Sequence, residues 1–180
     1  MTVSNLITSI RIILAPIFII YLINDQLLSG LVVFVICGVS DGVDGLVARL
    51  FKQKSRLGTY LDPLADKIIL ISAFVVLAVR GLLPSWLTVM VISRDTLILL
   101  GVIVIYINNM KLDIKPSLTS KITTCLQFIT VIAVLSHGYI SFISGFIIYL
   151  YYITALFTII SGLHYMHYWF KMMGESPDNV

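Results

Sequence analysis

Four aspartates lie close together in the first half of this 180-residue chain: Asp41, Asp44, Asp62 and Asp66. The first two are three residues apart and the last two are four apart, so each pair occupies one face if its segment is helical. A short basic connector between the pairs lets the two helices lie antiparallel, which brings the four carboxylates together at one depth. Four carboxylates in so small a space repel one another and would take up protons unless cations neutralised them.

The chemistry that suits this cluster is metal-assisted phosphoryl transfer. Carboxylate oxygens without paired His or Cys favour hard cations such as Mg²⁺ or Mn²⁺ over zinc. Two divalent ions would balance the four aspartates and form a clamp at a phosphate group. Gly45 and Ala48 lie one turn from Asp41 and Asp44, which leaves room for a ligand against the backbone. Arg49 can bind a phosphate oxygen through its guanidinium group. The alternative role for the four aspartates is to form salt bridges that only fix helix packing. Such packing needs fewer acidic residues than this segment contains.

The composition places this cluster in a membrane protein. Hydrophobic residues make up 59% of the chain and charged residues 12%, with a mean hydropathy of +1.03, whereas a soluble domain carries about 25% charged residues. This excludes an ordinary soluble enzyme, a disordered segment and a nucleic-acid module. The net charge of +3 adds only that basic residues can face anionic head groups. Cys37 and Cys125 lie in apolar surroundings and are expected to be buried packing thiols.

The apolar runs predict six helices, and because they are continuous rather than alternating, they favour helices over a β-barrel. The expected ranges are 5–24, 27–50, 61–80, 84–107, 117–136 and 144–170. A spanning helix needs about 20 mostly apolar residues, so the first four must accept charged residues at one end. We therefore expect one all-α polytopic membrane domain over residues 1–180, with six transmembrane helices and a first helix that is not cleaved as a signal peptide.

Basic residues indicate how these helices are oriented. They concentrate in two connectors expected on the same side, at Lys52, Lys54 and Arg56 and at Lys111 and Lys115. The positive-inside rule then places these connectors and both termini in the cytoplasm. The acidic cluster is expected at the same membrane face.

The acidic cluster is part of a longer pattern, Asp41-x2-Asp44-Gly45-x2-Ala48-Arg49-x8-Gly58-x3-Asp62-x3-Asp66. It resembles the signature of the CDP-alcohol phosphatidyltransferase family at every position. Two further segments are similar to parts of that family, Asn5-x2-Thr8-x2-Arg11 near the N-terminus and Leu61-Asp-Pro-Leu-Ala-Asp-Lys67, which is typical of bacterial and mitochondrial members. The resemblance covers nearly the whole chain.

The resemblance implies a six-helix fold, commonly homodimeric, that transfers a phosphatidyl group from CDP-diacylglycerol to an alcohol and releases CMP. The four aspartates would hold two divalent ions at the donor diphosphate, and Asp66 would also be the general base for the acceptor hydroxyl. Residues implied to bind CDP-diacylglycerol are Asn5, Thr8, Gly45, Ala48, Arg49, Ser55 and Gly58. The protein would lie in a bacterial inner membrane or the inner membrane of an organelle, with the site on the cytoplasmic side.

The acceptor is indicated by two later segments, Ser93-Arg94-Asp95 and Lys115-Pro116-Ser117-x2-Ser120-Lys121-x2-Thr124-x2-Gln127. They are most similar to the family members that use phosphatidylglycerol and make cardiolipin. Members that use glycerol 3-phosphate more often have Arg-Glu and Gly-Lys-x-Lys-Thr, where this chain has Asp95, Ser120 and Thr123 in place of the Glu, the Gly and the second Lys.

Charge favours the first acceptor. Glycerol 3-phosphate carries a phosphomonoester of about −1.5 to −2 charge, and the missing Lys weakens a pocket for it, whereas phosphatidylglycerol carries a singly charged phosphodiester. We therefore expect phosphatidylglycerol, bound by Arg94, Lys121, Thr124 and Gln127, with glycerol 3-phosphate as the alternative. Interhelix hydrogen bonding is the alternative role of Arg94, Lys121 and Gln127.

Two other classes of protein remain to be compared with the enzyme. An ion-coupled transporter favours acids near the bilayer midplane and paired half-helices, but these acids gather at one membrane face and no internal repeat is visible. A purely structural membrane protein would tolerate the loss of all four aspartates. His164 and His167 are three residues apart, but neighbouring aromatic residues indicate an interfacial belt rather than a metal pair.

Overall fold

The computed structural model describes residues 3–51, 56–107, 118–139 and 141–174, and the side chains of residues 13–40, 67–101, 104, 118–139 and 145–170. Within these ranges the protein is all helical and contains no strand, as the sequence predicts. The six helices are α1 (Val3–Ile23), α2 (Leu27–Phe51), α3 (Arg56–Val79), α4 (Ser85–Ile107), α5 (Leu118–Ser136) and α6 (Ser141–Gly174).

Most helix bounds agree with the expected ones, but two helices are longer. α3 begins at Arg56, whereas the apolar run predicts a start at residue 61, and α6 covers residues 141–174 rather than the predicted 144–170. The basic residues before position 61 suggested a loop, but Arg and Leu are good helix formers and a charge does not end a helix by itself. The connector between α2 and α3 is therefore shorter than expected.

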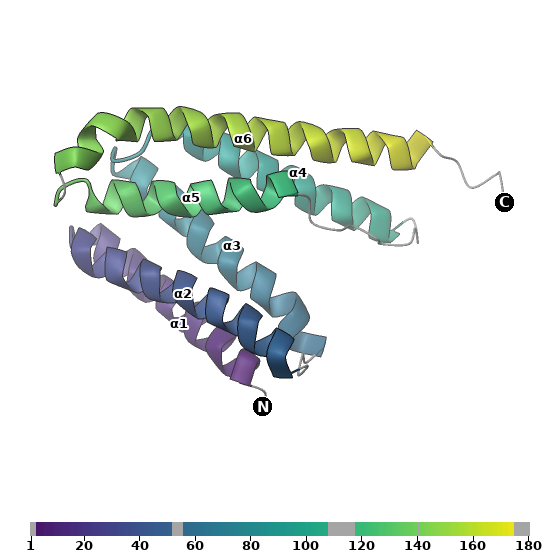
Figure 1. Cartoon of the computed structure of the whole chain (residues 1–180), viewed down its shortest axis with the longest axis horizontal. Coiled ribbons are helices and arrows are strands. Elements are labelled where there is room, and N and C mark those ends of the chain that lie inside the picture. Colours follow the sequence, from purple (N-terminus) through teal and green to yellow (C-terminus); the bar gives the residue numbers. More distant parts are fainter. Residues whose placement is uncertain (1–2, 52–55, 108–117, 140, 175–180) are drawn as a thin grey trace.

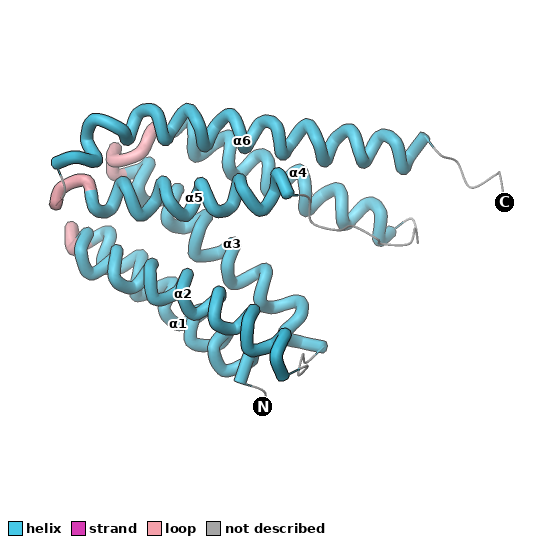
Figure 2. The backbone as a smooth tube through the Cα atoms, viewed as in Figure 1, coloured by secondary structure: helices cyan, strands magenta, loops and turns pink. Residues whose placement is uncertain are grey.

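Successive helices run in opposite directions, and the bundle has two distinct ends (Figure 1). The start of α1, the end of α2, the start of α3 and the C-terminal ends of α4 and α6 lie away from the short turns, at the lower centre and on the right of Figure 1. Short turns at residues 24–26, 80–84 and 137–139 lie at the other end (Figure 2). α1 packs against α2 and α3, and α6 packs against α4 and α5.

Aromatic side chains join the first helices to α5. The ring centroids of Phe18 and Phe34 are 5.5 Å apart, and those of Phe34 and Phe128 are 5.1 Å apart. α1 and α2 approach closely at Gly30, where an added Cβ would lie 2.9 Å from Leu22 Cδ2. A larger residue at that position would require the Leu22 side chain to move.

Large apolar side chains cover much of the outer surface as well as the core. Ile20, Val79, Leu99 and Leu163 are more than half exposed, which suits a lipid environment better than water. Among the described residues, two segments are long and apolar enough to cross a membrane, Leu118–Ser136 and Gly145–Phe170. Cys37 is buried, but Cys125 is exposed, so the expectation of two buried thiols was wrong for Cys125: its position on α5 faces away from the neighbouring helices.

An ion pair ties two turns together at the end of the bundle that carries the short turns. Arg80, after the end of α3, pairs with Asp25 in the α1–α2 turn and donates a hydrogen bond to the carbonyl oxygen of Leu22. Asp25 has a φ of 61°, a left-handed conformation that Asn and Asp tolerate better than most residues. The Asp25 side chain is 79% exposed.

Candidate active site

The backbone of α2 and α3 brings the four aspartates to one end of the bundle. Asp41 and Asp44 lie in the C-terminal half of α2, and Asp62 and Asp66 lie in the N-terminal half of α3. The two helices are consecutive and in contact, and each aspartate is roughly two to three helical turns from the connector between them. The four positions therefore lie at similar depth in the bundle.

Most of the residues expected to bind CDP-diacylglycerol share this end. Asn5 and Thr8 lie near the start of α1, Gly45, Ala48 and Arg49 in α2, and Gly58 in α3. Their side chains and those of the four aspartates lie outside the described residues, and so does Ser55 as a whole. The donor set, four carboxylates and no thiolate, fits a hard divalent cation. Among the described side chains, no group of three or more His, Cys, Asp or Glu residues offers another metal site.

A buried group of polar and charged side chains lies beside this region, and we call it the Arg94 cluster: Lys67, Arg94, Asp95, Ser120 and Ser161. Arg94 is 4% exposed and Asp95 is 8% exposed. Arg94 Nη1 donates to Asp95 Oδ1 at 2.7 Å, and the Lys67 ammonium group pairs with the other carboxylate oxygen of Asp95. Lys67 directly follows Asp66 in α3, so the cluster reaches the helix of the expected general base.

Arg94 also bonds to the last two helices. Its Nη2 lies 2.6 Å from Ser120 Oγ and 2.6 Å from Ser161 Oγ, and its Nε lies 3.2 Å from Ser161 Oγ. Its Cζ is 5.9 Å from the ring centroid of Tyr165, within the range of a cation–π interaction. The cluster thus joins α3, α4, α5 and α6, and its two cations and one anion leave one positive charge.

The four expected acceptor residues do not all converge. Arg94 is central to the cluster, but Lys121 is exposed. Thr124 is half-buried, and its hydroxyl donates to the Ser120 carbonyl oxygen at 3.1 Å. Gln127 is fully buried, and neither its amide nitrogen nor its amide oxygen has a hydrogen-bond partner among the described residues.

Thr123 stands where related enzymes for glycerol 3-phosphate more often have a second Lys. It is fully buried, and its hydroxyl lies 2.8 Å from the Thr119 carbonyl oxygen and 3.0 Å from that of Phe157. These bonds occupy the hydroxyl and hold α5 against α6. The position therefore contributes neither a cation nor a free donor to a phosphate.

The contacts of Lys67, Asp95 and Ser161 in the Arg94 cluster were not predicted from the sequence. Lys67 was visible as the residue after Asp66, and Asp95 as an acid inside an apolar helix, which calls for a cationic partner. No sequence signal singled out Ser161, because serines are common in the apolar helices of this chain.

Replacing Asp95 by Asn is expected to lower the free energy of unfolding in detergent by about 3 kcal/mol, because it leaves two buried or half-buried cations without their anion. The matched control is Asp25→Asn, which breaks an exposed pair and should cost about 1 kcal/mol or less. Denaturant unfolding followed by helix circular dichroism measures both. Equal losses for the two variants would mean that the Arg94 cluster does not stabilise the fold.

Comparison with known proteins identifies the family. A sequence model of the CDP-alcohol phosphatidyltransferase family matches residues 1–171. The human cardiolipin synthase (CMP-forming) is 32% identical over 93% of this chain and 61% of its own length. The Bacillus subtilis CDP-diacylglycerol–glycerol-3-phosphate 3-phosphatidyltransferase is 31% identical over 89% of this chain and 91% of its own length.

A putative cardiolipin synthase of Mycobacterium tuberculosis is 35% identical over 54% of this chain and 47% of its own length. The chain therefore spans about three fifths of the length of the human relative and about half of the mycobacterial one. Because the family model extends over nearly all of the sequence and includes the complete acidic signature, the chain belongs to the CDP-alcohol phosphatidyltransferase family.

Proposed function

We propose that this protein transfers a phosphatidyl group from CDP-diacylglycerol to phosphatidylglycerol and so forms cardiolipin and CMP. The observation that carries the proposal is the match to the family over residues 1–171, with the complete acidic signature on two adjacent antiparallel helices. The names of the human and mycobacterial relatives support cardiolipin as the product.

The chemistry follows from the residue types at the acidic end of the bundle. The acceptor hydroxyl oxygen attacks the β-phosphorus of the donor, the bond from that phosphorus to the bridging oxygen breaks, and CMP leaves with the bridging oxygen. Asp66 accepts the hydroxyl proton, and Arg49 with the residues around it binds the diphosphate. Mg²⁺ or Mn²⁺ held by Asp41, Asp44, Asp62 and Asp66 would neutralise negative charge on the diphosphate and the leaving group.

The Arg94 cluster supports a singly charged acceptor. Its described charges sum to one positive charge, and Thr123 adds none because it is neutral and bonded to backbone. Lys121 is exposed and can meet lipid head groups at the membrane surface. A phosphodiester needs one counter-charge, whereas the phosphomonoester of glycerol 3-phosphate needs nearly two. Glycerol 3-phosphate remains the second candidate acceptor because the Bacillus subtilis relative is named for it.

The same proposal includes a membrane arrangement. All six helices would span the bilayer with both termini in the cytoplasm, as a homodimer in a bacterial inner membrane or the inner membrane of an organelle. The basic connectors of the sequence and the exposed apolar side chains on the described helices support this arrangement.

Purified protein with CDP-diacylglycerol and Mg²⁺ is expected to release CMP and form cardiolipin when phosphatidylglycerol is added, and to give no product with glycerol 3-phosphate. CMP and lipid products are measured together by mass spectrometry, with a reaction lacking any acceptor as the control for hydrolysis. CMP release with glycerol 3-phosphate and not with phosphatidylglycerol would reverse the acceptor assignment.

A further inference from the structure

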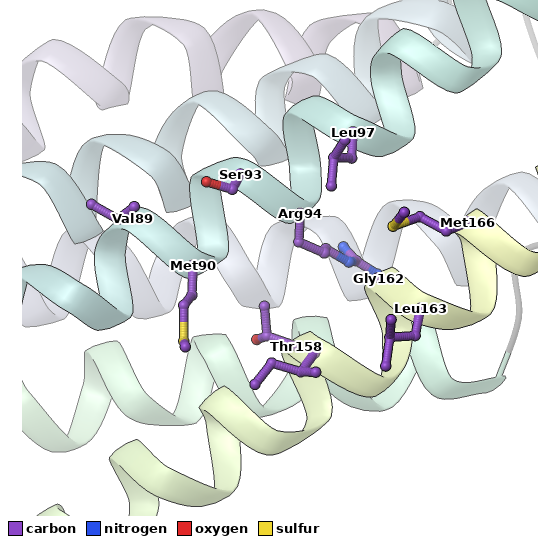
Figure 3. A pocket seen from close by; sticks show the side chains of 10 residues that line it. Val89, Met90, Ser93, Arg94, Leu97, Thr158, Gly162, Leu163 and Met166 are labelled. Atoms are coloured by element: carbon purple, nitrogen blue, oxygen red, sulfur yellow. The ribbon is translucent and has the colours of Figure 1, made fainter.

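A groove of about 260 Å³ lies between α4 and α6 (Figure 3). Thr158 in its lining is already bonded, since its hydroxyl donates to the Thr154 carbonyl oxygen at 2.7 Å. Most of the other lining side chains are hydrocarbon or thioether: Val89, Met90, Leu97, Ile159, Leu163 and Met166. The groove therefore fits an apolar chain better than a polar ligand.

The rims of the groove are open to the surroundings. Val89 is 62% exposed and Leu97 is 43% exposed on α4, and Leu163 is 60% exposed on α6. In a bilayer these side chains face lipid tails, so a hydrocarbon chain can enter sideways without crossing water. Along each wall the lining covers a little over two helical turns, about 12 Å, which is enough for a large part of one acyl chain.

Gly162 keeps the groove open next to a cation. Its position has no side chain, and a Cβ built there would lie 3.7 Å from Arg94 Cγ, at ordinary contact distance. Arg94 itself contributes to the lining, and Figure 3 shows its side chain extending from α4 toward Gly162. The Arg94 side chain therefore forms part of the wall of the apolar groove, and its guanidinium group is buried and bonded to Asp95, Ser120 and Ser161.

The charge of this wall matches an anionic lipid. Arg94 and Lys67 share Asp95, which leaves one positive charge in the cluster. The other hydrogen-bond partners of Arg94 among the described residues are the neutral hydroxyls of Ser120 and Ser161. A phosphodiester oxygen adds the attraction between opposite charges to its hydrogen bond with Arg94, which a neutral hydroxyl does not, so it competes well with these hydroxyls. A single negative charge joined to a hydrocarbon chain is the ligand that fits both features.

We propose that the α4–α6 groove holds an acyl chain of the acceptor phospholipid, with the acceptor phosphodiester bound at Arg94. This inference rests on the proposed function, because an acceptor needs an acyl groove only if it is itself a lipid. The head group then extends toward α3, where Lys67 of the cluster directly follows Asp66. A second copy of the chain is the competing occupant of the groove, and the test separates the two.

The test narrows the groove and measures each substrate separately. Gly162→Leu is expected to raise the apparent KM for phosphatidylglycerol about tenfold, because the narrower groove loses the contacts of roughly two methylene groups. The apparent KM for CDP-diacylglycerol should stay within about twofold of the wild-type value. KM is measured in mixed micelles as surface mole fraction. Gly145→Leu is the matched control on the same helix, because nothing lies within 4 Å of a Cβ built at Gly145.

Ser93→Leu narrows the groove from the α4 side at an exposed position and should give the same split. Its result stands on its own if Gly162→Leu fails to fold. Unchanged KM values in folded groove variants, or equal increases for both substrates, would overturn the inference alone. Loss of a dimer in crosslinking with unchanged KM values would assign the groove to a second copy. A wild-type protein that makes no cardiolipin overturns the proposed function, and the inference with it.

Discussion

Purified Asp66→Asn protein is expected to release CMP at least about 10³-fold more slowly than the wild type while keeping its helix content. The substitution removes the group that accepts the proton of the acceptor hydroxyl, and general base catalysis alone contributes about 10²- to 10⁴-fold. It also removes one of four carboxylates proposed to hold divalent ions at the diphosphate. Asn is close to Asp in size, so the loss should be chemical rather than structural.

The matched control is Asp25→Asn, which makes the same change in the exposed α1–α2 turn, away from the four aspartates. CMP release by this variant should equal that of the wild type, because Asn also tolerates the left-handed backbone of that turn. Normal CMP release by Asp66→Asn would remove the basis for the catalytic assignment. Normal release by variants of all four aspartates would show that the reaction does not need their carboxylates.

Chelation with EDTA is expected to reduce CMP release to background, and added Mg²⁺ or Mn²⁺ in excess of the chelator should restore it. The reason is electrostatic: four carboxylates and the diphosphate of the donor place several negative charges in one small volume, and they repel one another without cations. Helix circular dichroism should change little during chelation, since the described core is built from apolar contacts.

Two outcomes would contradict this expectation. Full activity in EDTA would show that the aspartates work without divalent ions. Rescue by Zn²⁺ and not by Mg²⁺ would disagree with an all-oxygen donor set. The ion-coupled transporter is tested in the same preparation, because ion flux into liposomes without any CDP-lipid would favour it over the transferase.

The fold was predictable from the sequence to the level of six helices and their order. Apolar runs and charged ends are local signals, so the bounds of α2, α4 and α5 agree within one residue with those expected. The start of α3 was not predictable in the same way. Lys52, Lys54 and Arg56 indicated a loop by their charge, but a charged residue at a membrane surface is compatible with either a loop or a helix that extends past the lipid.

In the candidate site, too, the features set by nearby residues were predictable from the sequence, and those set by contacts between distant helices were not. Asp41, Asp44, Asp62 and Asp66 have helical spacings that are visible in the sequence. The surroundings of Arg94 were not visible, because apart from the neighbouring Asp95 its partners come from α5 and α6, and their sequence separations carry no pattern. The exposure of Lys121 and the burial of Gln127 depend likewise on how α5 is rotated against its neighbours, which hydrophobic periodicity defines poorly in a helix that is apolar on most sides.

The Arg94 cluster also bears on how the chain enters a membrane during synthesis. In the proposed six-span arrangement, charged residues inside a spanning segment cost about 2.5 to 3.5 kcal/mol each on insertion. Arg94 and Asp95 are adjacent and paired, so α4 would enter with these two charges already compensated. Lys67 is synthesised before α4, so it can pair with Asp95 only after α4 has been made. Ser120 and Ser161, which bond to Arg94, are synthesised later still. Helix α3 is therefore expected to stay near the insertion machinery until α4 is made, and a chain truncated before α4 should be poorly retained in the bilayer.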